Sequence, residues 1–165
     1  VTPIQLAKAI SIIANDGLEV QPHLVSGILD KEGRVHPVRR GKRPRKVITA
    51  RSAERMRRIL AQVVTEGTGK RAKLRNYAVG GKTGTAQKVV DGRYASTYIA
   101  SFVGFTPVEE PELLTFVMVD EPEKGMYGGV VAAPIYKKIN EFAVRRLRIQ
   151  PQGLAANEAD RSLAR

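Results

Sequence analysis

Apolar residues recur at helical spacing near the start of the chain, directly after a helix-starting motif. Thr2 suits the N-cap, Pro3 suits the first helical position, and Gln5 completes a capping box with Thr2. Gly17 suits the left-handed residue that often ends a helix. The apolar positions at helical spacing are Leu6, Ala9, Ile10 and Ile13. The pattern predicts a core helix that starts at Thr2 and ends within residues 15–17.

Two further helices are predicted, over residues 50–66 and from Pro134 onward. The expected buried stripe of the first of these is Met56, Ile59, Leu60, Val63 and Val64. Three basic side chains are expected largely outside that stripe: Arg55, Arg57 and Arg58. The last helix should carry Ile135, Ile139, Phe142 and Leu147.

Extended segments fill the remaining length. Residues 24–29 and 34–38 predict two strands joined by a turn at residues 31–33. Three consecutive antiparallel strands are then predicted. The strand containing Lys82 comes first, and the Asp91-Gly92 pair, which suits a type I′ turn, joins it to the next.

The second of these three strands is predicted over residues 97–105. Residues 113–119 are apolar on both faces, as expected of an interior strand covered on both sides. The pattern predicts an α+β fold, in which the first and last helices cover an antiparallel sheet and the remaining helix packs nearby. The strand containing Lys82 is predicted to lie at the outside of this sheet.

The stretch 79–87 concentrates the candidate chemistry on this first strand. Lys82 supplies a compact positive charge, and the hydroxyls of Thr83 and Thr85 can help to hold a carboxylate. Gly84 has no Cβ, so a ligand backbone can approach closely there. At a sheet edge, unpaired backbone groups can bind an extended peptide.

Two other interpretations of this stretch remain open at this point. A phosphate-binding loop needs a glycine five positions before the Gly-Lys-Thr at residues 81–83, but Asn76 stands there. The other interpretation is a glycine-containing strand and turn that has no chemical role. If Lys-Thr-Gly were the only signal, this interpretation would be favoured over a functional site. The surrounding segments must decide.

Those segments resemble the penicillin-binding proteins. Residues 81–87 are similar to the Lys-Thr-Gly signature of that family, its third motif. Four other segments resemble it in the same order, namely residues 1–7, 63–69, 100–107 and 128–134. The resemblance covers residues 1–149 and is strongest to the class B transpeptidases. Glu121-Pro122 and residues 127–129 resemble the division type.

The chain departs from the family pattern in one important respect. The nucleophile motif Ser-x-x-Lys and the second motif Ser-x-Asn are both absent from the sequence. The segment Thr85-Ala86-Gln87-Lys88 imitates the first, but it overlaps the strand motif and is rejected. Residues 1–149 are therefore expected to be the C-terminal portion of a transpeptidase domain, with a loosely ordered tail at 150–165. The nucleophile would lie in an upstream part of the same polypeptide, so this chain alone is expected to be inactive.

The resemblance implies a serine β-lactamase-like fold and a serine D,D-transpeptidase that cross-links peptidoglycan stem peptides and is acylated by β-lactams. It assigns substrate binding to Lys82, Thr83, Gly84 and Thr85. Catalytic roles would fall to Lys82 and to the backbone N–H of Thr85, in the oxyanion hole. It implies no metal or organic cofactor. It places the enzyme on the outer face of the bacterial inner membrane, in a cell-wall synthesis complex. A β-lactam sensor and a non-catalytic scaffold of the same fold are the alternatives.

The net charge of +12 raises a different possibility, a basic nucleic-acid-binding module. The charge is concentrated in residues 39–46, where no aromatic residue is interleaved, so bases would have no stacking platform. A solvated basic loop is the favoured interpretation. Contact with anionic phospholipid or cell-wall polymer comes next, and nucleic acid comes last.

The remaining polar residues offer weaker signals. His23 and His36 have no acidic or histidine partner at metal-ligand spacing, so neither is assigned to catalysis or to a metal. Asp120, Glu121 and Glu123 follow the end of a strand, which favours an exposed loop over a carboxylate pair. The sequence has no cysteine, which excludes disulfides, and no apolar run of 18 residues.

Overall fold

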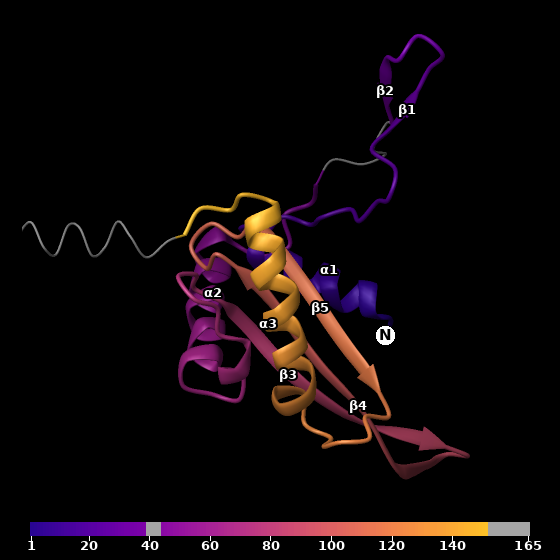
Figure 1. Cartoon of the computed structure of the whole chain (residues 1–165), viewed down its shortest axis with the longest axis vertical. Coiled ribbons are helices and arrows are strands. Elements are labelled where there is room, and N and C mark those ends of the chain that lie inside the picture. The colour runs from indigo at the N-terminus through magenta and orange to yellow at the C-terminus, as the bar shows by residue number, and fades with distance from the viewer. Residues whose placement is uncertain (39–43, 152–165) are drawn as a thin grey trace, which may run out of the picture.

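The computed structural model describes residues 1–38 and 44–151 (Figure 1). In chain order the elements are α1 (Pro3–Ala14), β1 (Gly27–Leu29), β2 (Val35–Pro37), α2 (Ala50–Thr65), a 3₁₀ turn η1 (Lys70–Ala72), β3 (Gly80–Val90), β4 (Arg93–Thr106), β5 (Leu113–Asp120) and α3 (Gly128–Arg146). The predicted mixture of helices and an antiparallel sheet is confirmed.

The sheet has the order β3-β4-β5, and both pairings are antiparallel. Within the described residues β3 pairs only with β4, so its predicted outer position is confirmed. The interior position predicted for residues 113–119 is wrong, because β5 forms the opposite margin. Its apolar character on both faces has another cause. Both α1 and α3 contact β5, and their clusters lie on opposite faces of the sheet.

Two apolar clusters hold the helices to the sheet. On one face Phe102 of β4 packs with Tyr136 of α3, and their ring centroids are 4.8 Å apart in an edge-to-face arrangement. On the other face Phe105 packs with Ile10 and Ile13 of α1. Helix α2 lies beside the sheet and contributes to both clusters. Its Val64 packs in the first cluster and its Leu60 in the second. Figure 1 shows α3 across the strands and α2 alongside.

The start and end of α1 follow the predicted signals. Thr2 is the N-cap, and both hydrogen bonds of its capping box with Gln5 are present. The chain turns away at Gly17, which has φ +85°, and any Cβ there would collide with the carbonyl oxygen of Ile48. No residue of α1 is fully buried, so the helix covers the sheet with one half-buried side.

Helix α2 has the predicted length, but its buried side differs from the prediction. Its buried residues are Ala53, Arg57, Leu60 and Val64, whereas Met56 and Ile59 are 40% and 54% exposed. Arg57, expected outside the stripe, is 6% exposed. Its guanidinium donates to Ile13 O at 3.1 Å and to Asp16 Oδ1 at 2.7 Å. Burial is tolerated because these acceptors at the end of α1 replace water.

The last helix begins six residues earlier than predicted, at Gly128, with Pro134 inside it. The apolar residues expected in this helix do not face the sheet. Ile135, Ile139, Phe142 and Leu147 are 40–65% exposed, whereas the sheet-facing positions include Ala132, Ala133, Tyr136, Asn140 and Val144. Small residues face the strands in the first half of α3, which lets the helix backbone approach closely. Buried Asn140 is satisfied by Thr115 Oγ1 at 3.1 Å and Tyr136 O at 2.9 Å.

Two hairpins extend from this body. Asp91 and Gly92 both have positive φ, which confirms the type I′ turn between β3 and β4. Strands β1 and β2 pair only with each other among the described elements, and the predicted strand 24–29 is formed only from Gly27. Figure 1 shows this small hairpin standing away from the sheet.

Parts of two predicted segments lie outside the described residues. These are residues 39–43 of the basic run and residues 152–165 of the tail. Within the described part of the basic run, the Arg45 side chain is 75% exposed and lies 3.7 Å from a carboxylate oxygen of Glu19. This agrees with a solvated position for that residue. Glu19 also pairs with Lys8 of α1 at 2.6 Å.

The buried Arg57 gives a first prediction. Arg57→Met in the intact protein should lower the free energy of unfolding by about 2–3 kcal/mol, because it removes charge-assisted hydrogen bonds and leaves Ile13 O without a partner. Arg58→Met is the matched control. Its exposed pair with Glu54 should contribute about 0.5 kcal/mol or less. Urea denaturation of both variants checks this, and equal losses would contradict it.

Candidate functional site

The candidate motif lies at the start of β3, on the open margin of the sheet. Residues 80–90 are all strand, so the phosphate-loop interpretation is wrong, because Gly81-Lys82-Thr83 does not begin a helix. Gly81 is buried, and a Cβ there would lie 2.6 Å from the ring of Phe102. The motif's first glycines are thus required by packing.

Lys82 is exposed, and its Nζ donates to Thr83 O at 2.9 Å. Gly84 is half-buried, and a Cβ there would collide with the Ser101 hydroxyl on β4 unless that hydroxyl rotated away. The absence of a side chain at this position therefore has a reason within the fold, whether or not a ligand approaches it. Lys82 and Gly84 share one face of β3, since successive side chains alternate.

Thr83 and Thr85 lie on the opposite face and line a hollow of about 320 Å³. The structure therefore brings the two predicted hydroxyls together, whereas Lys82 is not among the residues that line this hollow. Its other walls are η1, the segment before it, and the start of α3, which contribute Thr68, Lys70, Arg71, Tyr127, Gly128, Gly129 and Val130.

Thr68 is a site residue that the sequence analysis did not single out. Its Oγ1 lies 2.8 Å from Thr83 Oγ1, a hydrogen bond that fixes the threonine on the strand. Thr68 lies in the segment 63–69, which resembles the family, but that resemblance carried no assigned role. The sequence pattern suggested no role for Lys70 and Arg71. The fold places both cations at the same hollow as the hydroxyls.

The N-terminus of α3 forms one wall of the hollow. Gly128 N donates to Thr85 Oγ1 at 3.3 Å. A Cβ on Gly128 would collide with the carbonyl oxygens of Ser101 and Gly84, so glycine allows the helix to start directly on β3 and β4. The first turn of α3 contains no acidic residue. Its partial positive charge adds to Lys70 and Arg71, and this arrangement favours a bound carboxylate.

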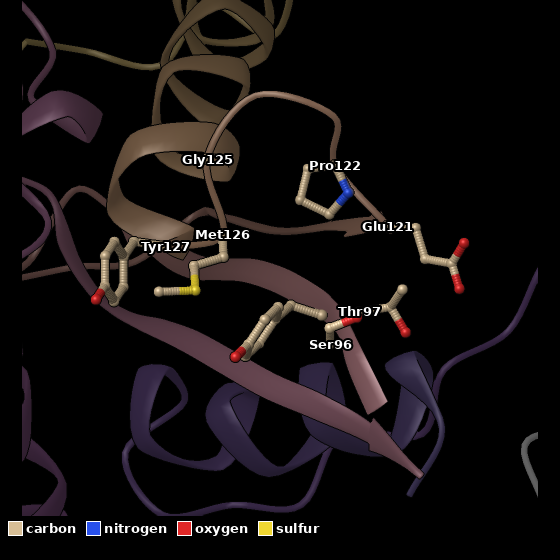
Figure 2. Close-up of a pocket in the computed structure, with 8 residues that line it drawn as sticks. Ser96, Thr97, Glu121, Pro122, Gly125, Met126 and Tyr127 are labelled. Atoms are coloured by element: carbon tan, nitrogen blue, oxygen red, sulfur yellow. The ribbon is translucent and has the colours of Figure 1, made fainter. Parts of the chain in front are cut away.

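A second hollow of about 500 Å³ lies beside the first, and Tyr127 lines both. Its walls come from β4 and from the segment that joins β5 to α3. Figure 2 shows Met126 and Tyr127 on that segment, opposite Ser96 and Thr97 of β4. Tyr98 and Pro122 also line it, so this hollow is largely apolar. A ligand held at the hydroxyls would have apolar surface next to it.

The predicted exposed loop after β5 is confirmed, since the Asp120 and Glu121 side chains are 56% and 53% exposed. Both bind Nζ of Lys88, at 3.0 Å and 2.8 Å. The hydrogen bond to Glu121, followed by that to Asp120, raises the pKa of Lys88 above its usual value.

His36 has an acidic partner that the spacing argument missed. Its Nε2 lies 2.7 Å from Asp30 Oδ2 on the β1–β2 hairpin. The hydrogen bond to His36, and next the backbone N–H of Arg34, hold the pKa of Asp30 below its usual value. Across residues 1–38 and 44–151, no group of three or more metal-ligating side chains is positioned to hold a metal. No helix in the described ranges has the length and apolarity needed to cross a membrane.

Comparison with known proteins identifies the family. The family model described as the penicillin binding protein transpeptidase domain matches residues 1–141. Stage V sporulation protein D of Bacillus subtilis is 39% identical over 155 residues, which are 92% of this chain and 24% of that protein. A probable peptidoglycan D,D-transpeptidase, PenA of Neisseria meningitidis serogroup A, is 41% identical over 152 residues, 90% of this chain and 24% of that protein.

The fold agrees with a solved relative. Penicillin-binding protein 3 of Mycobacterium tuberculosis, complexed with aztreonam, superposes with a TM-score of 0.81 at 28% identity, covering 92% of this chain and 37% of that one. The chain spans about a quarter of the length of the two curated relatives named above. The resemblance seen in the sequence is confirmed, and the chain belongs to the penicillin-binding protein transpeptidase family.

Proposed function

We propose that this chain is part of a peptidoglycan D,D-transpeptidase that works through a serine acyl-enzyme and is acylated by β-lactams. In this proposal the chain supplies one wall of the active site, and the serine comes from the rest of the polypeptide. The observation that carries it is the row of hydroxyls from Thr68, Thr83 and Thr85, which line one hollow together with Lys70 and Arg71. The relatives named as transpeptidases favour this function over a sensor, a scaffold or a nucleic-acid-binding module.

The first step is binding of the stem peptide along the outer margin of β3. The terminal carboxylate is held by the hydroxyls of Thr83 and Thr85, with Thr68 orienting the first of them. The positive end of α3 and the two cations of η1 add favourable potential there. Gly84 keeps the margin free of a side chain, so the peptide backbone can pair with the strand.

The chemical steps divide between this chain and the upstream part. The serine oxygen attacks the carbonyl carbon of the penultimate D-alanine, the terminal D-alanine leaves as an amine, and the amine of a second stem peptide then takes the acyl group from the serine. The Thr85 N–H donates to the developing oxyanion, and one such donor is worth about 2.7–4 kcal/mol. Lys82 extends from the other face of β3 toward upstream polar groups and assists proton transfer.

The setting of the intact protein follows from the same proposal. Its substrate lies in the cell wall, so we place the catalytic domain on the outer face of the bacterial inner membrane. Attachment to the membrane would be made by another part of the polypeptide. Work within a membrane-bound cell-wall synthesis complex is also part of the proposal. No step requires a metal or an organic cofactor.

Lys82 gives a direct test in the intact protein. Lys82→Ala should slow acylation by a fluorescent penicillin by about 100-fold or more, the usual range for a group that assists proton transfer. The melting temperature should change little because Lys82 is exposed. Lys138→Ala, on the exposed side of α3, is the control and should leave acylation unchanged. Unchanged acylation of the Lys82 variant would remove this residue from the mechanism.

Thr68 offers a test of the hydroxyl row. Thr68→Val keeps the shape but removes the partner of Thr83 Oγ1, so acylation should fall by about tenfold, the value of one lost hydrogen bond. The matched control is Thr65→Val, whose hydroxyl contacts only carbonyls of its own helix. Stopped-flow measurement of the acylation rate of both variants tests this. Equal rates would contradict a role for Thr68 in orienting the Thr83 hydroxyl.

The missing nucleophile can be tested on the chain by itself. The purified 165-residue chain should show no covalent label after incubation with fluorescent penicillin, because it contains no Ser-x-x-Lys motif. The intact protein, treated in parallel, should label stoichiometrically. Mass spectrometry reports both results. A stoichiometric adduct on the short chain would reveal a nucleophile within these residues.

A further inference from the structure

Lys88 bridges the two margins of the sheet. It lies three residues beyond Thr85 on β3, at a register irregularity between Gln87 and Val89. Its Nζ donates to Asp120 Oδ1 at 3.0 Å, to Asp120 Oδ2 at 3.3 Å and to Glu121 Oε1 at 2.8 Å. The two acidic residues are at the end of β5, and β4 lies between β5 and β3. The side chain therefore reaches across the middle strand, and a bulge is a usual means of re-aiming a side chain in this way.

These carboxylates mark the beginning of the connector, which we define as residues 121–127 between β5 and α3. Glu121 has φ +48°, an unfavourable backbone conformation for a residue with a Cβ, and its N–H donates to Tyr98 O at 2.9 Å. At the other end Gly128 N donates to Thr85 Oγ1. The connector is thus attached to β3 at both ends, through residues 88 and 85.

The burial and charge of Lys88 favour a persistent contact with Asp120 and Glu121. The Lys88 side chain is 28% exposed, whereas both carboxylates are more than half exposed. Two acceptors on consecutive residues restrain the ammonium group more than a single pair would. Because the hydrogen bonds that Lys88 donates to Glu121 and Asp120 raise its pKa, its charge persists throughout the neutral range.

The connector in turn forms part of the candidate site. Tyr127 lines both hollows, and Glu121, Pro122 and Met126 line the larger one (Figure 2). Lys88 lines neither hollow. Its effect on a ligand in either hollow is therefore indirect, and the connector that it contacts lines both hollows.

We propose that Lys88 is a positioning residue, which ties the connector to β3 through Asp120 and Glu121 and so keeps Tyr127 and Gly128 in place beside Thr83 and Thr85. The role rests on the proposed transpeptidase function, because it concerns the shape of that site. Without the bridge, the junction between β5 and the connector would keep its backbone contacts to β4, at Ile99 and Tyr98, but would lose its tie to β3. The connector would then sample positions that widen the hollow, and fewer molecules would be ready to bind.

The test uses the intact protein and four variants: Lys88→Met, Lys88→Arg, Glu121→Gln, and the double variant Lys88→Met with Glu121→Gln. Lys88→Met should lower the second-order rate constant for acylation by a fluorescent penicillin about tenfold. Lys88→Arg should restore most of it. The double variant should be no slower than Lys88→Met alone, because both changes remove the same contact.

A structural readout separates positioning from general destabilisation. Hydrogen–deuterium exchange should become faster in peptides that cover residues 121–129 of Lys88→Met, with α2 unchanged. Lys124→Met is the matched control, since this exposed lysine lies on the same connector outside the lining residues. It should behave like the unmodified protein in both measurements.

Several results would overturn the proposal. Unchanged acylation and exchange in Lys88→Met would do so, as would faster exchange across the whole domain, or additive losses in the double variant. If acylation still depends on Lys82 in that case, the transpeptidase function stands and only the positioning role fails. If the intact unmodified protein is not acylated at all, the proposed function fails instead, and the exchange measurement decides whether Lys88 restrains the connector.

Discussion

The start of α3 lies directly on strands β3 and β4 at Gly128, which contributes no side chain to the contact. Gly128 makes this possible, because any Cβ there would meet the carbonyl oxygens of Ser101 and Gly84. The contact brings the helix N-terminus to Thr85 and fixes where the connector must end. Ala132 and Ala133 continue the close approach, and Tyr136 then fills the space over Phe102. The hollow at Thr83 and Thr85 exists because the helix begins at this point.

Much of the fold could be predicted from local signals. The capping box at Thr2, the Asp91-Gly92 turn and the apolar runs of β4 and β5 each depend on neighbours in the sequence, and the structure confirms them. The outer position of β3 followed from chain order alone. Buried sides were harder to predict. Arg57 is buried because the end of α1, more than 40 residues earlier, supplies its acceptors, and no periodicity within α2 contains that information.

The candidate site shows the same division. Lys82, Thr83, Gly84 and Thr85 form a contiguous motif, so the sequence identified them together. Thr68 joins them only through a hydrogen bond that spans 15 positions. The 3₁₀ turn η1 adds Lys70 and Arg71, for which the sequence pattern suggested no role. Because side chains alternate along a strand, the sequence also predicts that Lys82 lies on the opposite face of β3 from Thr83 and Thr85.

That alternation constrains how one ligand could use the whole motif. A strand in the middle of a sheet would place Lys82 and the Thr83 hydroxyl in separate compartments, one on the α1 face and one on the α3 face. At the margin of the sheet the two faces meet, so an extended peptide lying along β3 can contact groups from both. Under the proposed function one peptide uses the whole motif, which requires an edge strand, and Gly84 leaves that edge without a side chain. Under the proposed mechanism, the upstream part of the polypeptide would need to face the margin rather than either face of the sheet, because only there could the proposed serine lie near Lys82 and the threonine hydroxyls together.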